Sequence, residues 1–291
     1  MIIFEHKVWL PQGKTCYIVP IGDVHYNVID ADKARFHRLI NWIYRKVEAG
    51  DLVKIIGMGD MCDTFSTSER DAIRGAKGGK GLHDTTLETF DKLAFEIADE
   101  FIEAILPIKN CFVGLLEGHH YMMFSHYSSG KFTGQSTTQY IASRLGCQYF
   151  GRVAKGDMIF APSNLIKLKL GIVAHHGWGA GRTKGARLNK REQFGQQHPD
   201  ANLVFMGHDH EKMIGVSQRL ITDPASPDGL SMSKQYLIGT GSFLKGYQTD
   251  RVIGSYIEEA GLPPSELGVA MVKVETEKRD GRWRLDFHAS I

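Results

Sequence analysis

The sequence contains no long apolar run, no excess of one charge and no closely paired cysteines. No stretch approaches the roughly 18 consecutive apolar residues that a membrane-spanning helix needs, so we expect no membrane association. Its 35 basic and 33 acidic residues leave a net charge of +2, which does not by itself indicate a polyanionic partner. The four cysteines include no CxxC pair, and residues 1–10 lack the basic-then-apolar order of a signal peptide. We therefore expect free thiols and a cytoplasmic protein.

The 291 residues, 42% of them hydrophobic, suffice for a domain with a full core. Strands and helices alternate in the first half, and strands dominate the second. This order predicts a layered α/β fold in a single domain, 1–291, in which about 262–291 complete a second sheet or form a small cap. Asp30 is expected to cap the first helix, and Thr85 with Glu88 has capping-box spacing. The expected helices are 31–47, 85–106 and 137–145, and the expected strands are 15–22, 52–57, 110–116, 157–161, 165–174, 202–206, 235–240, 268–275 and 283–288.

Histidine is the residue type that stands out. Of the 13 histidines, seven lie in short clusters that also contain glycine or aspartate. Each cluster directly follows an apolar run that we expect to be a strand, and open α/β sheets place their sites at the carboxyl ends of strands. The five clusters are Gly22-Asp23-Val24-His25, Gly59-Asp60-Met61-Cys62-Asp63, Gly118-His119-His120, His175-His176-Gly177 and Gly207-His208-Asp209-His210.

Aspartate and histidine together suit divalent transition metals such as Mn, Fe or Zn. One Asp-x-His pattern arises often by chance, and an isolated histidine after a strand is more often a hydrogen-bonded structural residue than a ligand. Five such clusters in order, each at a strand end, instead indicate a metal site. A carboxylate can bridge two ions, and two ions about 3.5–4 Å apart can hold a phosphate and activate a water.

The ordered set resembles the motifs of the calcineurin-like metallophosphoesterase superfamily, which run DxH, GDxxD, GNH[DE], a His-Gly pair and GHxH. They match at 23–25, 59–63, 118–120, 175–177 and 207–210. The resemblance implies a four-layer αββα sandwich of two mixed β-sheets flanked by helices. It also implies a dinuclear-metal-dependent phosphoester hydrolase that uses a metal-bound hydroxide.

The resemblance gives each matched residue a role. His120 would donate a hydrogen bond or proton to the phosphate or leaving group, and Asp63 would orient that imidazole. The ligands that it implies are Asp23, His25 and His210 for the first metal, Asp60 as the bridge, and His119, His176 and His208 for the second metal.

One position departs from the family pattern, because His119 stands where the family has an Asn ligand. We expect two divalent ions, with Mn as the first choice, and an imidazole at position 119 would favour softer ions such as Zn or Fe. Two alternatives stay open: a shifted register makes His119 the acid and leaves no ligand at Gly118, or His119 points away from a weakly held second metal. His176 is expected to be a ligand rather than His175, because it directly precedes Gly177.

Local sequence also bears on the substrate. Phosphoprotein phosphatases of the superfamily follow GDxxD with Arg-Gly, and that arginine grips a terminal phosphate. Here Thr64 and Phe65 follow instead, which favours phosphodiesters. We therefore predict a phosphodiesterase with nuclease activity on DNA or RNA. The alternatives are a phosphomonoesterase or nucleotide phosphatase, and an inactive metal-stabilised binding scaffold, against which the retained His120 and Asp63 argue.

Two stretches rich in glycine and basic residues, 70–81 and 179–191, follow metal motifs and are expected to be loops at the rim of the site. In the second, Arg182, Lys184 and Arg187 are the residues expected to contact substrate. Such loops can track a polyphosphate backbone, which makes nucleic acid a candidate partner. Basic residues in surface loops are as often merely solvated.

Overall fold

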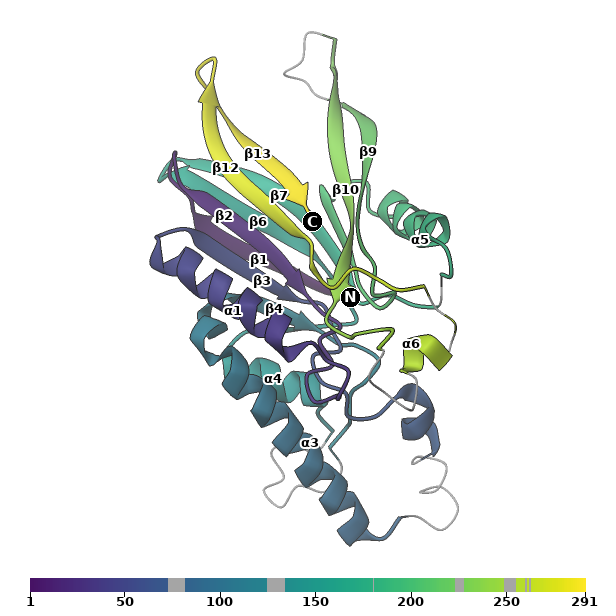
Figure 1. Ribbon diagram of the computed structural model, residues 1–291. Helices are drawn as coiled ribbons and strands as arrows, with labels where there is room; N and C mark the ends of the chain where they lie inside the picture. Colours follow the sequence, from purple (N-terminus) through teal and green to yellow (C-terminus); the bar gives the residue numbers. More distant parts are fainter. Residues whose placement is uncertain are drawn as a thin grey trace.

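The computed structural model describes residues 1–72, 82–124, 134–179, 181–222, 228–248, 255–259, 261 and 263–291. Within them, two β-sheets pack face to face (Figure 1). One is six-stranded, in the order β13-β12-β2-β3-β4-β5, and the other is seven-stranded, in the order β1-β6-β7-β8-β10-β11 with β9 paired to β10. The strands are β1 (Ile2–Trp9), β2 (Thr15–Ile21), β3 (Leu52–Gly57), β4 (Phe112–Leu116), β5 (Gln148–Gly151), β6 (Val153–Ser163), β7 (Ile166–His175), β8 (Leu203–Met206), β9 (Lys212–Thr222), β10 (Leu230–Ser242), β11 (Gly268–Val269), β12 (Met271–Arg279) and β13 (Arg282–Ser290).

Helices cover the outer faces of both sheets, so that the layers run α, β, β, α (Figure 1). Helices α1, α3 and α4 pack on the six-stranded sheet, and α5 packs on the other. A separate apolar core fills the space between the sheets. The predicted αββα sandwich is therefore confirmed. The helices are α1 (Lys33–Glu48), α3 (Asp84–Ile105), α4 (Thr137–Leu145), α5 (Lys184–Gln196), the short α6 (Tyr256–Glu259) and the 3-10 turn η1 (Leu106–Cys111).

Strand β2 shows why the central strands are readable from sequence. Cys16 and Ile18 face the core between the sheets, whereas Val19 and Ile21 face the core under α1 and α3. A strand buried on both faces has no polar side to alternate with its apolar one, and it reads as a continuous apolar run. Full burial of a side chain such as Ile18 contributes about 1.5–3 kcal/mol.

The helix caps differ from the predicted ones. Asp32, not Asp30, caps α1, and its carboxylate accepts from the backbone N of Arg35 at 2.9 Å. His83 caps α3 through a contact with the backbone N of Thr85, so the predicted Thr85–Glu88 capping box was wrong. Asp and His side chains compete for the exposed N–H groups at a helix start, and sequence spacing alone does not choose between nearby candidates.

The structure contains elements that the sequence did not predict. Strands β1, β5 and β9 were missed. The stretch 179–191 was expected to be a loop, but α5 begins at Lys184, so this prediction was wrong over most of its length. Residues 67–72 are helical, and residues 73–81 of the other expected loop lie outside the described residues. At the other end of the chain, β12 pairs with β2, so the C-terminal strands extend the six-stranded sheet.

The direction of the strands gathers the motifs at one edge. Strands β2, β3 and β4 run parallel, and so do β7, β8 and β10, so the carboxyl ends of each set lie together. Each histidine or aspartate cluster follows one of these ends. Over the described parts of the chain, no helix is both long and apolar enough to cross a membrane.

Candidate metal centre

The seven side chains proposed from sequence as metal ligands meet at this edge in two groups. Within each group, one ligand atom from every residue lies within 4.8 Å of those of the others. One group follows β3, β4, β7 and β8, and the other combines residues after β2 with His210 of the loop after β8. The groups are Asp60, His119, His176 and His208, and Asp23, His25 and His210.

In the first of these groups, His176 is held in a defined orientation. It is buried, and its Nδ1 donates to the carbonyl oxygen of Met58 at 2.7 Å. Its Nε2 lies 3.0 Å from Asp60 Oδ2. A ring nitrogen bonded to a backbone carbonyl leaves the other nitrogen for a metal, which is the usual arrangement of a metal-binding histidine.

His119 points into the same group. Its ring centroid lies 4.5 Å from that of His208 and 4.8 Å from that of His176. Its Nδ1 is buried without a hydrogen-bond partner. The structure thus places three imidazoles around Asp60 rather than turning His119 away.

In the second group, several buried polar atoms likewise lack hydrogen-bond partners. His25 and Asp23 are buried, and both ring nitrogens of His25 and the Oδ1 of Asp23 lack hydrogen bonds. His210 Nε2 lies 3.4 Å from that same Oδ1. A buried polar atom without a partner costs roughly 1–3 kcal/mol, so several of them aimed at one point fit a site that a cation completes.

Asp60, the carboxylate of the first group, is fixed by the loop after β4. Its Oδ1 accepts from the backbone N of His119 at 2.7 Å and of His120 at 2.9 Å. Gly118 makes this approach possible, because a Cβ there would lie 1.9 Å from Asp60 Oδ1. The two bonds orient the carboxylate so that its Oδ2 faces the histidines.

Backbone conformation also marks the site. Six described residues other than glycine have positive φ, and five of them belong to the two groups. Such conformations are unfavourable for side chains with a Cβ and persist only where the surroundings enforce them, as they often do at functional sites. The five are Asp23, His25, Asp60, His208 and His210.

His120 lies beside the groups and pairs with Asp63, with 2.7 Å between Nδ1 and Oδ1. Asp63 is held in turn by Asn27, whose side chain donates to its carbonyl oxygen at 2.7 Å and accepts from its backbone N at 2.8 Å. The other carboxylate oxygen of Asp63 lies 3.4 Å from His25 Nδ1. His120, Asp63 and His25 are also close enough together to form a third possible set of ligands.

The electrostatics of the site follow from burial and from the opposite charges within it. Burial opposes ionisation of Asp60, yet the charge and hydrogen bond of His176 hold the pKa of Asp60 well below its usual value. Burial likewise opposes the charge on His176, but Asp60 raises the pKa of His176 to about 9. Burial and the nearby His176 lower the pKa of His208 to about 4. His120 behaves like His176: burial opposes its charge, and the hydrogen bond to Asp63 raises its pKa.

Two further motif residues, His175 and Asp209, also lie outside both groups. The ring of His175 packs edge-on against Trp178 and Phe194, and its Nδ1 accepts from the backbone N of Gly177 at 2.7 Å. Asp209 is buried and forms an ion pair with Arg191 of α5, with 2.6 Å between Oδ1 and Nη2. The sequence set both residues apart from the ligands, but it did not predict that Asp209 pairs with Arg191.

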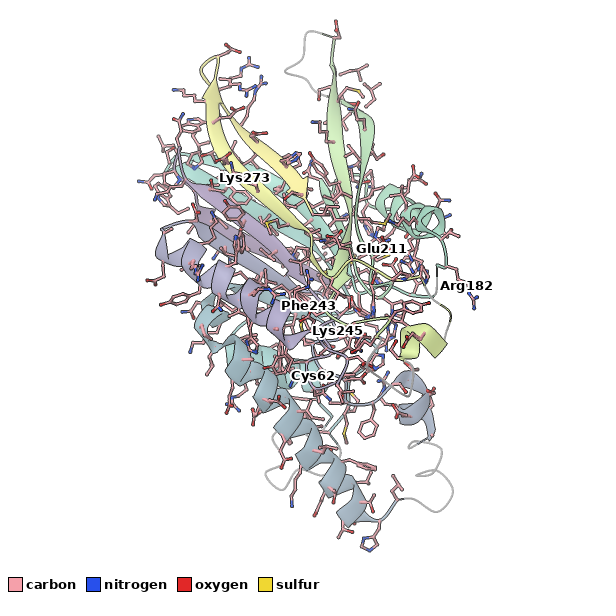
Figure 2. All side chains as sticks on the ribbon, in the orientation of Figure 1. Cys62, Arg182, Glu211, Phe243, Lys245 and Lys273 are labelled. Atoms are coloured by element: carbon pink, nitrogen blue, oxygen red, sulfur yellow. The ribbon has the colours of Figure 1, made fainter. Side chains whose placement is uncertain are left out.

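The basic residues expected at the rim are placed differently from one another. Arg182 is exposed and points away from the body of the protein (Figure 2). Lys184 is exposed at the start of α5. Arg187 is buried, and its guanidinium bonds to Glu211 and to the carbonyl oxygen of Gly181. Its expected contact with substrate is therefore corrected, because its donors face inward.

Arg70 is also buried, and it supports the loop after β4 from behind. Its Nη1 donates to the carbonyl oxygens of His119 at 2.6 Å and of Tyr121 at 2.9 Å, and its guanidinium lies 3.9 Å from the centre of the Tyr121 ring. Arg70 opens the stretch 70–81 that was expected to be a rim loop, but its donors face the protein interior.

Arg152, in the turn between β5 and β6, was missed by sequence reasoning. It is exposed, its Nη2 donates to the hydroxyl of Tyr121 at 3.3 Å, and its charge reaches the site. The pKa of His119 is lowered by burial first, then by His176, with Arg152 as a smaller contribution. No motif surrounds Arg152, so only the fold could reveal it.

No protein-family model matches the chain, and no curated protein matches it. Among solved structures, zinc-complexed Vps29 from Entamoeba histolytica is 12% identical, with a TM-score of 0.35, and the match covers 94% of this chain and 98% of that one. Vps29 from Cryptosporidium parvum is 10% identical, with a TM-score of 0.31, and the match covers 96% and 98%.

A third solved structure, from Streptococcus pneumoniae, is described as a conserved predicted phosphoesterase. It is 11% identical, with a TM-score of 0.30, and the match covers 94% of this chain and 88% of that one. At such identities and scores, these likenesses support no statement about ligands or activity. The chemistry of the site therefore rests on its own residues.

Proposed function

We propose that this chain, a member of the calcineurin-like metallophosphoesterase superfamily by its motifs and fold, is a phosphoester hydrolase that depends on two divalent metal ions and acts on phosphodiesters. The observation that carries the proposal is the meeting of seven Asp and His side chains beside His120, a histidine that belongs to neither of the two groups and pairs with Asp63. Asp63 also lies near the ligand His25, but a site that only bound metal through the seven ligands would have no use for His120.

The residues fit two ions of borderline hardness. His119, His176 and His208 would hold one ion, Asp23, His25 and His210 would hold the other, and Asp60 would lie between them. Their unpartnered buried atoms are those that cations would complete. When bound, two divalent ions supply positive charge to the phosphate and lower the pKa of water.

The three imidazoles around Asp60 make the two sites unequal. Nitrogen-rich sites favour Zn or Fe over Mn, so the site that contains His119 is proposed to prefer the softer ion. The other site has one carboxylate of its own and two imidazoles, and it is proposed to accept Mn more readily.

His120 is proposed to be the proton donor. Asp63 occupies its Nδ1 and fixes the tautomer, which leaves Nε2 as the atom that would meet the leaving oxygen of a substrate. The raised pKa of His120 keeps the imidazole protonated closer to neutral pH, as a general acid requires.

Phosphodiesters are favoured because the position after Asp63 offers no cation. Thr64 uses its backbone N and its hydroxyl to bond the carbonyl oxygen of His120, at 3.2 and 3.1 Å. The specific phosphodiesterase activity that we propose is that of a nuclease, with the exposed Arg182 as a candidate contact to a polynucleotide backbone.

A phosphomonoesterase is the second candidate, and Arg152 is the observation that favours it. An exposed guanidinium beside the His119 site could hold the extra charge of a terminal phosphate. The two candidates thus differ in what Arg152 does.

The test uses metal-free protein reloaded with Mn²⁺ or Zn²⁺. It would be assayed on a chromogenic phosphodiester, a chromogenic phosphomonoester, and labelled single- and double-stranded DNA. Asp60→Asn is the inactive variant, and Asp200→Asn, an exposed Asp before β8 at the opposite end of that strand, is the matched control.

Each outcome selects one function. Diester or DNA cleavage that Asp60→Asn loses and Asp200→Asn keeps supports the proposal. Monoester cleavage alone, weakened by Arg152→Met, supports the second candidate. No cleavage of any substrate by metal-loaded protein supports the inactive scaffold instead.

A further inference from the structure

The loop that carries His208 and His210 is held from its outer side by α5. We propose that Arg191, through its buried ion pair with Asp209, is a positioning residue that fixes both histidines for metal binding, with Arg187 and Glu211 as a second clamp. The inference rests on the proposed function, because it presumes that the two groups bind metal.

The first clamp lies directly between the two histidines. Arg191 is fully buried, and its Nη2 lies 2.6 Å from Asp209 Oδ1. That oxygen also accepts from the backbone N of Glu211 at 3.3 Å, which closes the loop on itself. The Nη1 of Arg191 donates to the carbonyl oxygen of Arg187 at 2.9 Å, so one guanidinium joins the helix to the loop.

The second clamp holds the far end of the loop. The Nη1 of Arg187 lies 2.5 Å from Glu211 Oε2, and both side chains are buried. Figure 2 shows Glu211 between the β9–β10 hairpin and α5. Since Glu211 directly follows His210, the two ion pairs bracket that histidine.

The loop needs such support because of its backbone. His208 has a φ of 70° and His210 a φ of 55°, in the left-handed region that side chains with a Cβ rarely adopt. A residue in this conformation tends to return to a negative φ unless the surrounding structure holds it in place. The arginine pairs fix the residue on either side of His210.

The helix that supplies the arginines is itself anchored. Phe194 and Leu188 of α5 pack against Val204 and Met206 of β8, the strand that leads into the loop. The chain of support therefore runs from this small core, through the arginines, to the loop and its histidines.

Folding alone does not account for these pairs. A buried ion pair loses the hydration of both charges, and apolar residues of similar size often stabilise a fold equally well. An apolar pair, however, makes no directional hydrogen bonds and so cannot hold the loop in one geometry. This difference separates a positioning role from a merely structural one.

The experiment compares the wild-type chain with the double variant Arg191→Met/Asp209→Leu. Arg219→Met is the matched control, because Arg219 also bonds backbone carbonyls but lies on β9. Each metal-free protein would be titrated with Co²⁺ while its visible spectrum is recorded, and its thermal unfolding would be measured without metal.

We expect the double variant to unfold near the wild-type temperature and yet to bind Co²⁺ roughly 10–100-fold more weakly, with an altered spectrum, because residues that orient metal ligands have effects of that size. Wild-type affinity and spectrum in the folded double variant would overturn the proposal and leave the metal centre intact. A wild-type chain that binds no Co²⁺ would overturn the proposed function as well.

If the double variant does not fold, Arg191→Lys carries the same comparison. It keeps the buried charge but loses the forked guanidinium that reaches the helix and the loop together. We expect a several-fold weaker affinity for Co²⁺, and an unchanged affinity would overturn the proposal.

Discussion

The imidazole of His120 and the carboxylate of Asp63 are joined at 2.7 Å, next to the seven proposed metal ligands but outside that set. Asn27 bonds both the backbone N and the carbonyl oxygen of Asp63, so the backbone that carries the carboxylate is held in place. A pair that is fixed in this way is suited to proton transfer.

Replacing His120 by Gln tests that role. We expect turnover to fall by roughly 10²–10⁴-fold, the range for loss of a general acid, while both metals stay bound. Steady-state kinetics and elemental analysis of the variant measure the two quantities. Loss of one metal in the variant would show that His120 is a ligand and that the alignment at 118–120 is shifted.

The Asp63→Asn variant tests the origin of the charge on His120. The hydrogen bond that His120 donates to Asp63 raises the pKa of His120. The proposed acid acts only while it is protonated, so activity should fall at pH values above that pKa. Removing the carboxylate lowers the pKa, and we expect the alkaline limb of the pH–rate profile to move to lower pH. If the alkaline limb does not move, a group other than His120 must set its position.

His119→Asn restores the amide that the family carries at this position. Replacing an imidazole nitrogen by an amide oxygen weakens the binding of Zn²⁺ more than the binding of Mn²⁺. We expect the ratio of Zn²⁺ to Mn²⁺ affinity to fall by roughly tenfold, measured by competition titration. An unchanged ratio would mean that His119 contacts neither ion.

Metal binding is expected to release a proton from His176. Asp60 raises the pKa of His176 to about 9, so the metal-free imidazole is protonated at pH 7.5 and must lose that proton to bind a metal through Nε2. The pKa of His208 is about 4, so His208 contributes no proton. Calorimetry of Zn²⁺ binding in buffers of different ionisation enthalpy should show release of about one proton, which disappears above pH 9. Equal heats in all buffers at pH 7.5 would contradict the assignment.

The fold and the gathering of the site were readable from sequence for a shared reason. The central strands are buried on both faces, so residues such as Ile18 and Val19 form unbroken apolar runs. The polar clusters that interrupt those runs then lie at strand ends. Parallel strands bring such ends together, and this places Asp60 near His176 without any long-range information.

Helix α5 was not readable, and its arginines explain why. Arg187 and Arg191 take inward positions where a typical helix has apolar residues, and basic residues near glycines suggest an exposed loop. Their partners Glu211 and Asp209 lie about 20 residues away in sequence. An ion pair of that kind leaves no periodic pattern, so only the folded chain shows that these charges are buried. The same holds for Arg152, whose contact with Tyr121 depends on the turn between β5 and β6.

The most direct measurement is anomalous diffraction from crystals of the protein soaked in Mn²⁺ and Zn²⁺, with data collected at both metal edges. Two ions are expected, each within about 2.0–2.3 Å of its ligands, one among His119, His176 and His208 and the other among Asp23, His25 and His210, with Asp60 reaching both. A single ion held by His25, Asp63 and His120, or no ion at all, would contradict this expectation.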